Sequence, residues 1–252
     1  MKRPVEHAAD DARRLWHGSF DGVLSTQSQA EPGYPFGSVV PFCLDQHARP
    51  LLLLSHLAQH CHNLDADPRC ALTLFKRPAG DIQQGPRLTC IADCRAIHGK
   101  PSDGQADNRT DNGAHDLALD RYCRHFPKGR VYAEQLGFRL YRVEPRRWHY
   151  NGGFATARWL SADRIMTTLP FAPETEQALL DRLKSERRHW LFSQFDASGI
   201  EPPEAVGFDR WGLTLRGGER MLRLNAKMPL DGWGALIAAI DDDALHPWPK
   251  MC

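Results

Sequence analysis

The sequence has no apolar run long enough to span a membrane and no excess of either charge. Its longest apolar candidates, at 51–54 and 235–240, fall far short of the ~20 residues that a membrane-spanning helix needs. Lys and Arg number 32 against 31 Asp and Glu, which gives a formal net charge of +1, and no basic block stands out. We therefore expect neither a membrane partner nor a nucleic-acid partner.

Several motifs of chemistry are also missing. No G-x-S-x-G, G-x-G-x-x-G or Walker pattern occurs, so no motif supports a hydrolase or a nucleotide kinase function. The seven cysteines are scattered and never spaced as C-x-x-C, which argues against a disulfide framework and a zinc ribbon. We expect most of them to be buried as small apolar side chains. The first residues lead into a charged helix rather than an apolar signal core, so a cytoplasmic location is expected.

What the sequence does contain is a series of short apolar segments separated by turn residues. Apolar side chains from Val5 to Trp16 recur at helical spacing and predict an amphipathic opening helix. The strands that we expect lie at 20–27, 36–44, 51–54, 69–75 and 87–97, with the last ones between 138 and 159. Short links and one intervening helix favour a closed antiparallel barrel over a doubly wound sheet.

The pattern changes after residue 160. A helix is expected over 178–195, then a hairpin whose two-residue turn is Gly217-Gly218, then a helix over 233–245 that leads into a tail with His246. The sequence therefore predicts two domains, a barrel over residues 1–160 and a small α+β domain over 161–252.

Residues 51–75 pack a strand, a short helix and a second strand into one segment. Four leucines predict a strand buried on both sides, Ser55 is expected to be the N-cap of the helix, and Pro68 ends it. The first N–H groups of such a helix form an anion site. His56 and His60, four residues apart, are spaced for zinc, but Leu57 stands where an HExxH site has its glutamate, and helix-cap or surface histidines are the alternative.

This segment, together with YPFGSVVPF at 34–42 and GGFATA at 152–157, resembles the pyridoxamine-phosphate-oxidase-like split-barrel proteins. Within them it is most similar to the haem-utilisation branch of HugZ type, and the resemblance covers roughly residues 10–160. It implies an α+β fold with an antiparallel split β-barrel, a homodimer, and a small-molecule cofactor at the subunit interface.

In the oxidase relatives the cofactor is flavin mononucleotide (FMN), and cationic side chains neutralise its phosphate. The resemblance places those positions at Gly37, Phe42, Gln59 and His60, of which only a protonated histidine could carry charge. Ser38, Ser55, His60 and Arg87 would then remain around the phosphate and ring. An FMN-dependent oxidoreductase is accordingly the alternative function, with weaker flavin binding than in an oxidase.

The haem-utilisation branch keeps the pattern Ser55-x-x-Ala58-x-His60-x-x-Asn63-Leu64, and its implied activity is oxygen-dependent cleavage of haem. Haem requires an axial histidine, cations for its propionates and apolar walls. The cations would be Arg146 and Arg147, and the walls Trp148, Tyr150 and Phe154, unless these residues are simply the alternating faces of one strand. Some haem-binding relatives draw the iron ligand from the C-terminal tail, so His246 comes before His60.

We therefore expect a haem-utilisation protein that binds haem, with oxidative degradation and release of iron as the reaction. The second alternative, beside the FMN-dependent oxidoreductase, is a split-barrel dimer that binds a small molecule without catalysis. Against haem, 182–187 lacks the two histidines that many relatives carry in the helix of the second domain.

Overall fold

The computed structural model describes residues 4–78, 80–98, 112–153, 157–166, 173–195 and 203–247. The chain divides into two compact units, of which the first comprises residues 1–166 with 251–252 and the second 167–250. The short helix α5 (Ala162–Ile165) contacts the opening helix α1 (Pro4–His17), which is why it belongs to the first unit. The domain limits expected from the sequence, 1–160 and 161–252, stay a prediction.

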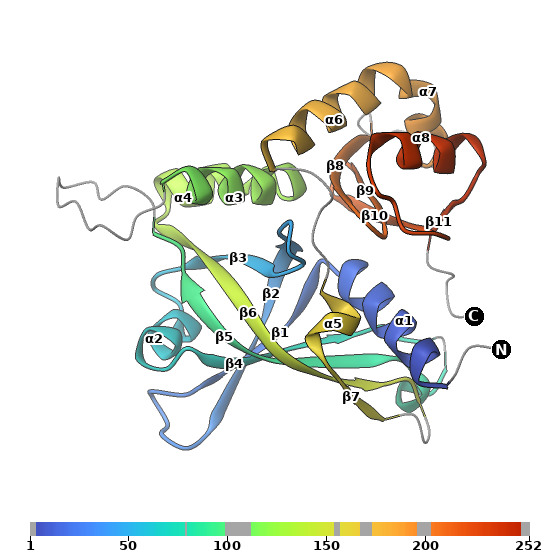
Figure 1. Cartoon of the computed structure of the whole chain (residues 1–252). Helices are drawn as coiled ribbons and strands as arrows, with labels where there is room; N and C mark the ends of the chain where they lie inside the picture. Colours follow the sequence, from blue (N-terminus) through green and yellow to red (C-terminus); the bar gives the residue numbers. More distant parts are fainter. Residues whose placement is uncertain are drawn as a thin grey trace. The chain divides into compact units, whose positions relative to one another are not determined.

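The first unit is a closed antiparallel barrel with helices around it (Figure 1). The strands follow the order β3-β2-β1-β4-β5-β6-β7, and β3 also pairs with β6, which closes the barrel. The α+β class and the split barrel predicted from the sequence are therefore confirmed. The elements in chain order after α1 are β1 (Asp21–Gln27), β2 (Pro35–Leu44), β3 (Pro50–Ser55), α2 (Gln59–Ala66), β4 (Arg69–Phe75), the 3-10 helix η1 (Ile82–Gln84), β5 (Arg87–Ala96), α3 (Asn112–His125), α4 (Gly129–Gln135), β6 (Phe138–Asn151), β7 (Arg158–Leu160) and α5.

The four leucines of β3 are buried on both faces, as their sequence predicts. Leu51 and Leu53 join a cluster under α3, and all four leucines are at most 4% exposed. Trp16 of α1 packs edge-on against Trp148 of β6, with ring centroids 5.5 Å apart. The opening helix and α3 thus bury apolar surface of the barrel and stabilise it.

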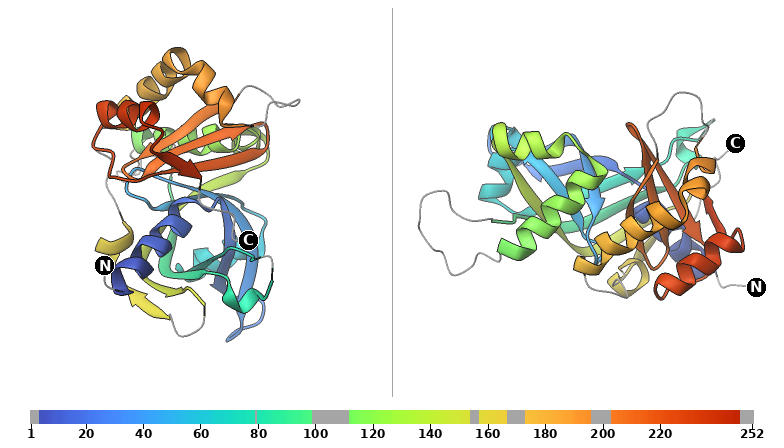
Figure 2. Two further views of the ribbon diagram at one scale, coloured as in Figure 1. Left: turned by 90° about the vertical axis from the view of Figure 1, so that its right-hand side faces the viewer. Right: turned by 90° about the horizontal axis from the view of Figure 1, so that it is seen from above.

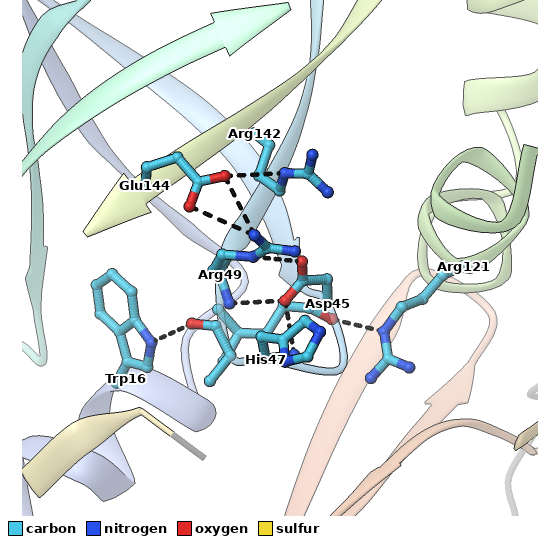
Figure 3. A network of polar contacts seen from close by, with 9 residues as sticks. Trp16, Asp45, His47, Arg49, Arg121, Arg142 and Glu144 are labelled. Carbon is cyan, nitrogen blue, oxygen red and sulfur yellow. Dashed lines mark hydrogen bonds and ion pairs between the residues drawn. The ribbon is translucent and has the colours of Figure 1, made fainter. Parts of the chain in front are cut away.

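Polar contacts fix the turn between β2 and β3 (Figure 3). The buried carboxylate of Asp45 accepts hydrogen bonds from two backbone N–H groups of the turn and from Arg49 Nε. The Arg49 guanidinium also contacts Glu144 on β6. The side chains of Trp16 and Arg121 donate to carbonyl oxygens of the same region. This turn therefore links α1, α3 and β6.

The second unit is a four-stranded antiparallel sheet of order β11-β10-β9-β8 with helices packed on one face (Figure 2). Leucine side chains of α6 and α8 pack against Phe208 and Leu213 of the sheet and are buried there. Its elements are α6 (Pro173–Glu186), α7 (Arg188–Ser193), β8 (Glu204–Asp209), β9 (Gly212–Gly217), β10 (Arg220–Ala226), α8 (Trp233–Asp241) and β11 (Leu245–Pro247).

The local predictions need four corrections. The helix expected over 178–195 is two helices, because the chain breaks at Arg187, whose φ and ψ are −127° and 30°. The hairpin turn is Gly218-Glu219, since Arg220 pairs with Gly217. The helix expected to reach residue 245 ends at Asp241, and His246 lies in strand β11 rather than in a tail. Ser55 pairs with Phe138 in the barrel, so it belongs to a strand, and Ala58 is the N-cap of α2.

Within the described ranges, no helix combines the length and the hydropathy that crossing a membrane requires. Five cysteines, at 43, 61, 70, 90 and 94, are buried as free thiols, as expected, and Cys123 is half-buried.

Candidate functional site

Two of the residues nominated from the sequence meet where α2 lies beside β2. The Ser38 hydroxyl is 3.1 Å from His60 Nδ1, and both side chains are half-buried. Burial lowers the pKa of His60, so its imidazole is neutral at pH 7. The other ring nitrogen, Nε2, is buried and has no hydrogen-bond partner among the residues that the structure describes. His60 therefore offers this site a neutral ring rather than a positive charge.

Asn63 holds α2 in place instead of facing a ligand. It is 0% exposed. Its Oδ1 accepts hydrogen bonds of 2.9 Å from the Gln29 backbone N–H and from Gln59 Nε2, while its Nδ2 donates to Thr26 Oγ1 at 2.9 Å. These bonds occupy both amide atoms and connect α2 with β1 and the loop after it. We conclude that Asn63 is a structural residue.

The positions that would neutralise a flavin phosphate carry no cation. Phe42 is 0% exposed in the barrel core, and Gly37 lies on an exposed part of β2. The Gln59 amide is bound to Asn63, and Ser55 Oγ accepts a hydrogen bond from the Leu57 backbone N–H at 3.4 Å. With a neutral His60 beside them, these groups offer a phosphate only hydrogen bonds, which are weaker than charge-assisted ones.

The nominated residues of β6 point in different directions. Trp148 is 0% exposed and lies in the core against Trp16, so it does not line an open site. Arg146 is at a β-bulge and forms a 2.5 Å ion pair with Asp93. Arg147 is exposed, and its Cζ lies 4.7 Å from the centroid of the Trp159 ring. The strand's alternating faces, the second interpretation of this segment, account for the arrangement, and Phe154 lies outside the described residues.

Arg87 and His246 complete the nominated set. Arg87 begins β5, pairs with Asn151 of β6, and donates from Nη1 to the Ile82 carbonyl at 3.3 Å. His246 belongs to the second unit, where it pairs with Asn225 at the edge of the sheet and is exposed.

Sequence reasoning missed His149, which follows Trp148 on β6. Its ring centroid lies 4.9 Å from that of Trp159, at an interplanar angle of 60°. The signal was present in the sequence, because Trp148 and Tyr150 are apolar and point inward, and residues between inward-facing positions of a strand face outward. Alternation therefore could have placed Arg147 and His149 together on the outer face.

The histidines considered for zinc do not share a helix. His56 lies in the turn before α2, with its Nδ1 2.8 Å from the Gly137 carbonyl oxygen, whereas His60 is inside the helix. Across the described part of the chain, no group of three or more His, Cys, Asp and Glu side chains is placed to hold a metal ion. The spacing of His56 and His60 therefore has no structural counterpart as a metal site.

A closed antiparallel barrel with a helix between two of its strands defines the split-barrel class, and the comparisons agree with it. The chain belongs to the CREG β-barrel family, whose model matches residues 3–165. Over 154 residues it is 34% identical to a protein of Arabidopsis thaliana named "Non-canonical heme oxygenase HOZ, chloroplastic". The match covers 61% of this chain and 42% of that protein, so the chain spans less than half of its relative's length.

Two solved structures share the fold over nearly the whole chain. One is a protein of unknown function from Agrobacterium tumefaciens, with 21% identity, a TM-score of 0.72 and 94% of each chain covered. The other is a heme binding protein from Mycobacterium smegmatis, with 21% identity, a TM-score of 0.53, and 94% of this chain and 96% of that chain covered. At this level of identity the likeness concerns the fold.

Proposed function

We propose that this protein binds haem as a substrate and supports its oxidative cleavage. The observation that carries the proposal is the 34% identity, over 154 residues, with a relative named as a haem oxygenase. That relative is much longer than the matched part, so its activity is transferred to this chain only as a proposal.

The chemistry of the described side chains suits haem better than FMN. A porphyrin dicarboxylate binds through an axial imidazole, apolar contact and guanidinium groups. The chain offers the neutral imidazole of His60, the exposed His246, and the exposed guanidinium of Arg147. A flavin phosphate would instead need cations at positions where the chain has Gly37, Phe42 and Gln59.

When bound, the haem iron supplies the centre at which dioxygen is reduced with electrons from an external donor. The protein's own part is to bind and orient the porphyrin. Of the two histidines nominated from the sequence, His246 is exposed, whereas the free nitrogen of His60 is buried and would need local movement to reach an iron.

We also propose a homodimer, supported by an apolar outer face of the barrel sheet. Val39, Val23, Thr73 and Thr89 are successive register partners across β2, β1, β4 and β5. Val39 is 77% exposed, and Ile91, on the same outer face, is 44% exposed. Exposed apolar side chains on a sheet face are the kind of surface that protein interfaces cover. A second copy of the chain would cover it and place a small-molecule site at the subunit interface.

A cytoplasmic location is proposed as well, and the five buried free thiols support it, since reducing compartments keep cysteines unpaired. The Arabidopsis relative is a chloroplast protein by its name. Localisation of a fluorescent fusion in the native cell would test the proposal.

Haemin titration of the purified protein tests the proposed function. We expect a saturable shift of the Soret band and, with ascorbate in air, loss of that band together with iron trapped by a ferrous chelator. Absence of a saturable Soret change would refute haem binding. Flavin retained through purification would instead favour the FMN-dependent oxidoreductase, and neither spectrum would favour the non-catalytic binding module.

A further inference from the structure

One cluster of side chains on the barrel's outer face is not explained by packing of the fold. On β6, Trp148 and Tyr150 are buried in the core, so Arg147 and His149 face outward. His149 pairs with Thr89 of β5 on one side and with Trp159 of β7 on the other. Arg147, His149 and Trp159, here called the outer-face cluster, therefore lie next to one another.

The contacts within the outer-face cluster centre on the Trp159 ring. The Arg147 Cζ is 4.7 Å from the ring centroid, and the His149 ring approaches at 4.9 Å and 60°. Trp159 nevertheless remains 48% exposed. Cation–π and edge contacts hold an indole in one orientation. The cluster therefore presents an ordered aromatic surface rather than a loose side chain.

The charge of Arg147 has no carboxylate partner in the ranges that the structure describes, and the His149 imidazole makes no hydrogen bond there. The neighbouring Arg146 is different, because Asp93 neutralises it at 2.5 Å. Arg87 adds a second guanidinium on the same face, opposite Asn151, which lies two residues from His149 or about 7 Å along the strand. A guanidinium beside an exposed aromatic ring suits a flat, apolar molecule that carries carboxylates.

We propose that the outer-face cluster is where this protein binds haem. His149 is the imidazole that contacts the iron, Arg147 pairs with a propionate, and Trp159 packs against the porphyrin edge. The inference rests on the proposed function and gives it a location. Two of its members, His149 and Trp159, continue the register row of Val39, Val23, Thr73 and Thr89, in which Thr89 is the direct partner of His149.

A matched pair of arginine variants tests the carboxylate contact. Arg147→Gln and Arg146→Gln remove the same charge from adjacent exposed positions, but only Arg147 belongs to the cluster. In haemin titrations followed at the Soret band, Arg147→Gln should raise Kd about tenfold, as loss of one charge-assisted bond does, and Arg146→Gln should leave Kd unchanged. Equal values of Kd for both variants and the wild type would overturn the proposed carboxylate contact.

Histidine variants test the iron contact by electronic absorption and electron paramagnetic resonance spectra of the bound haemin. His149→Gln should abolish the histidine-ligated spectrum, whereas His246→Gln and His60→Gln should retain it. If the wild type shows no saturable Soret change, the proposed function and this site fail together. If the wild type binds haemin and His149→Gln keeps its spectrum, the site is wrong while the function stands. Circular dichroism checks that His149→Gln is folded. Should this variant be unfolded, the two arginine variants test the proposed site instead.

Discussion

At the scale of single residues, the half-buried imidazole of His60, which contacts Ser38, gives the stability of the protein a measurable dependence on pH. Burial lowers the pKa of His60 below its ordinary value of 6.5. The folded state therefore binds a proton at this ring less readily than the unfolded chain does. His60 contributes its stability above about pH 6.5, and that contribution is lost as pH falls through the lower folded pKa.

His60→Gln should therefore reduce the loss of stability between about pH 7.5 and pH 5.5, measured by urea unfolding at both values. His62→Gln is the matched control, because it removes an exposed imidazole from the same helix. If His60→Gln and the wild type lost equal stability over this range, the His60 ring would not be a buried, neutral imidazole in the folded state.

The resemblance nominated Ser38 and His60 together, and the two side chains are in contact, but it nominated Asn63 for the cofactor as well and did not nominate His149. The motif that contains His60 also contains Asn63, and spacing cannot tell a ligand from a residue that fastens a helix. That difference depends on Thr26 and Gln29, which are distant in sequence. His149 was overlooked because its neighbour Trp148, the larger aromatic side chain, was assigned to the haem site, although the fold places Trp148 in the core.

At the scale of elements, local signals located the opening helix and the first five strands to within a few residues. They failed where the structure of a segment depends on its pairing with a distant strand. Ser55 has the side chain of an N-cap but pairs with Phe138 in the barrel. The short strand β11 exists only because Leu245–Pro247 pairs with β10, and three residues carry no periodicity of their own.

The attachment of α2 to the barrel is a testable property of an element. Asn63→Leu keeps a similar volume but removes the partner of the part-buried Gln29 N–H and of the buried Thr26 hydroxyl. We expect it to lower the free energy of unfolding by roughly 2 kcal/mol, the cost of unsatisfied buried polar groups. Chemical denaturation measures the change. His62→Ala, on the exposed face of the same helix, should remain within about 0.5 kcal/mol of the wild type, and an equally small effect of Asn63→Leu would refute the structural role.

At the scale of the whole molecule, the pattern of short linked strands predicted a closed antiparallel barrel, and the resemblance predicted the split-barrel type. Closure depends on the pairing of β3 with β6, whose partners Leu51 and Arg142 are far apart in the chain. The second unit could be predicted only in outline, because its strands β8 and β11 lack clear alternation or length.

The proposed homodimer can be tested at its surface. Sedimentation of the wild type at micromolar concentration should give about twice the 28.5 kDa of one chain. Val39→Glu adds a charge on the apolar outer face at a position that is 77% exposed, so the fold tolerates it but a covered interface does not. Leu57→Glu is the matched control, because Leu57 is 74% exposed and lies in the turn before α2 rather than in a strand of that face.

We expect Val39→Glu to sediment as a monomer and Leu57→Glu as a dimer. A monomeric wild type would refute the homodimer, and a dimeric Val39→Glu would place its interface elsewhere. Haemin titration of the Val39→Glu monomer then links assembly to binding. Because His149 and Trp159 continue the register row that contains Val39, a haem site completed by the second copy should lose affinity in this variant and keep it in Leu57→Glu. Unchanged affinity in the monomer would show that one chain holds the porphyrin by itself.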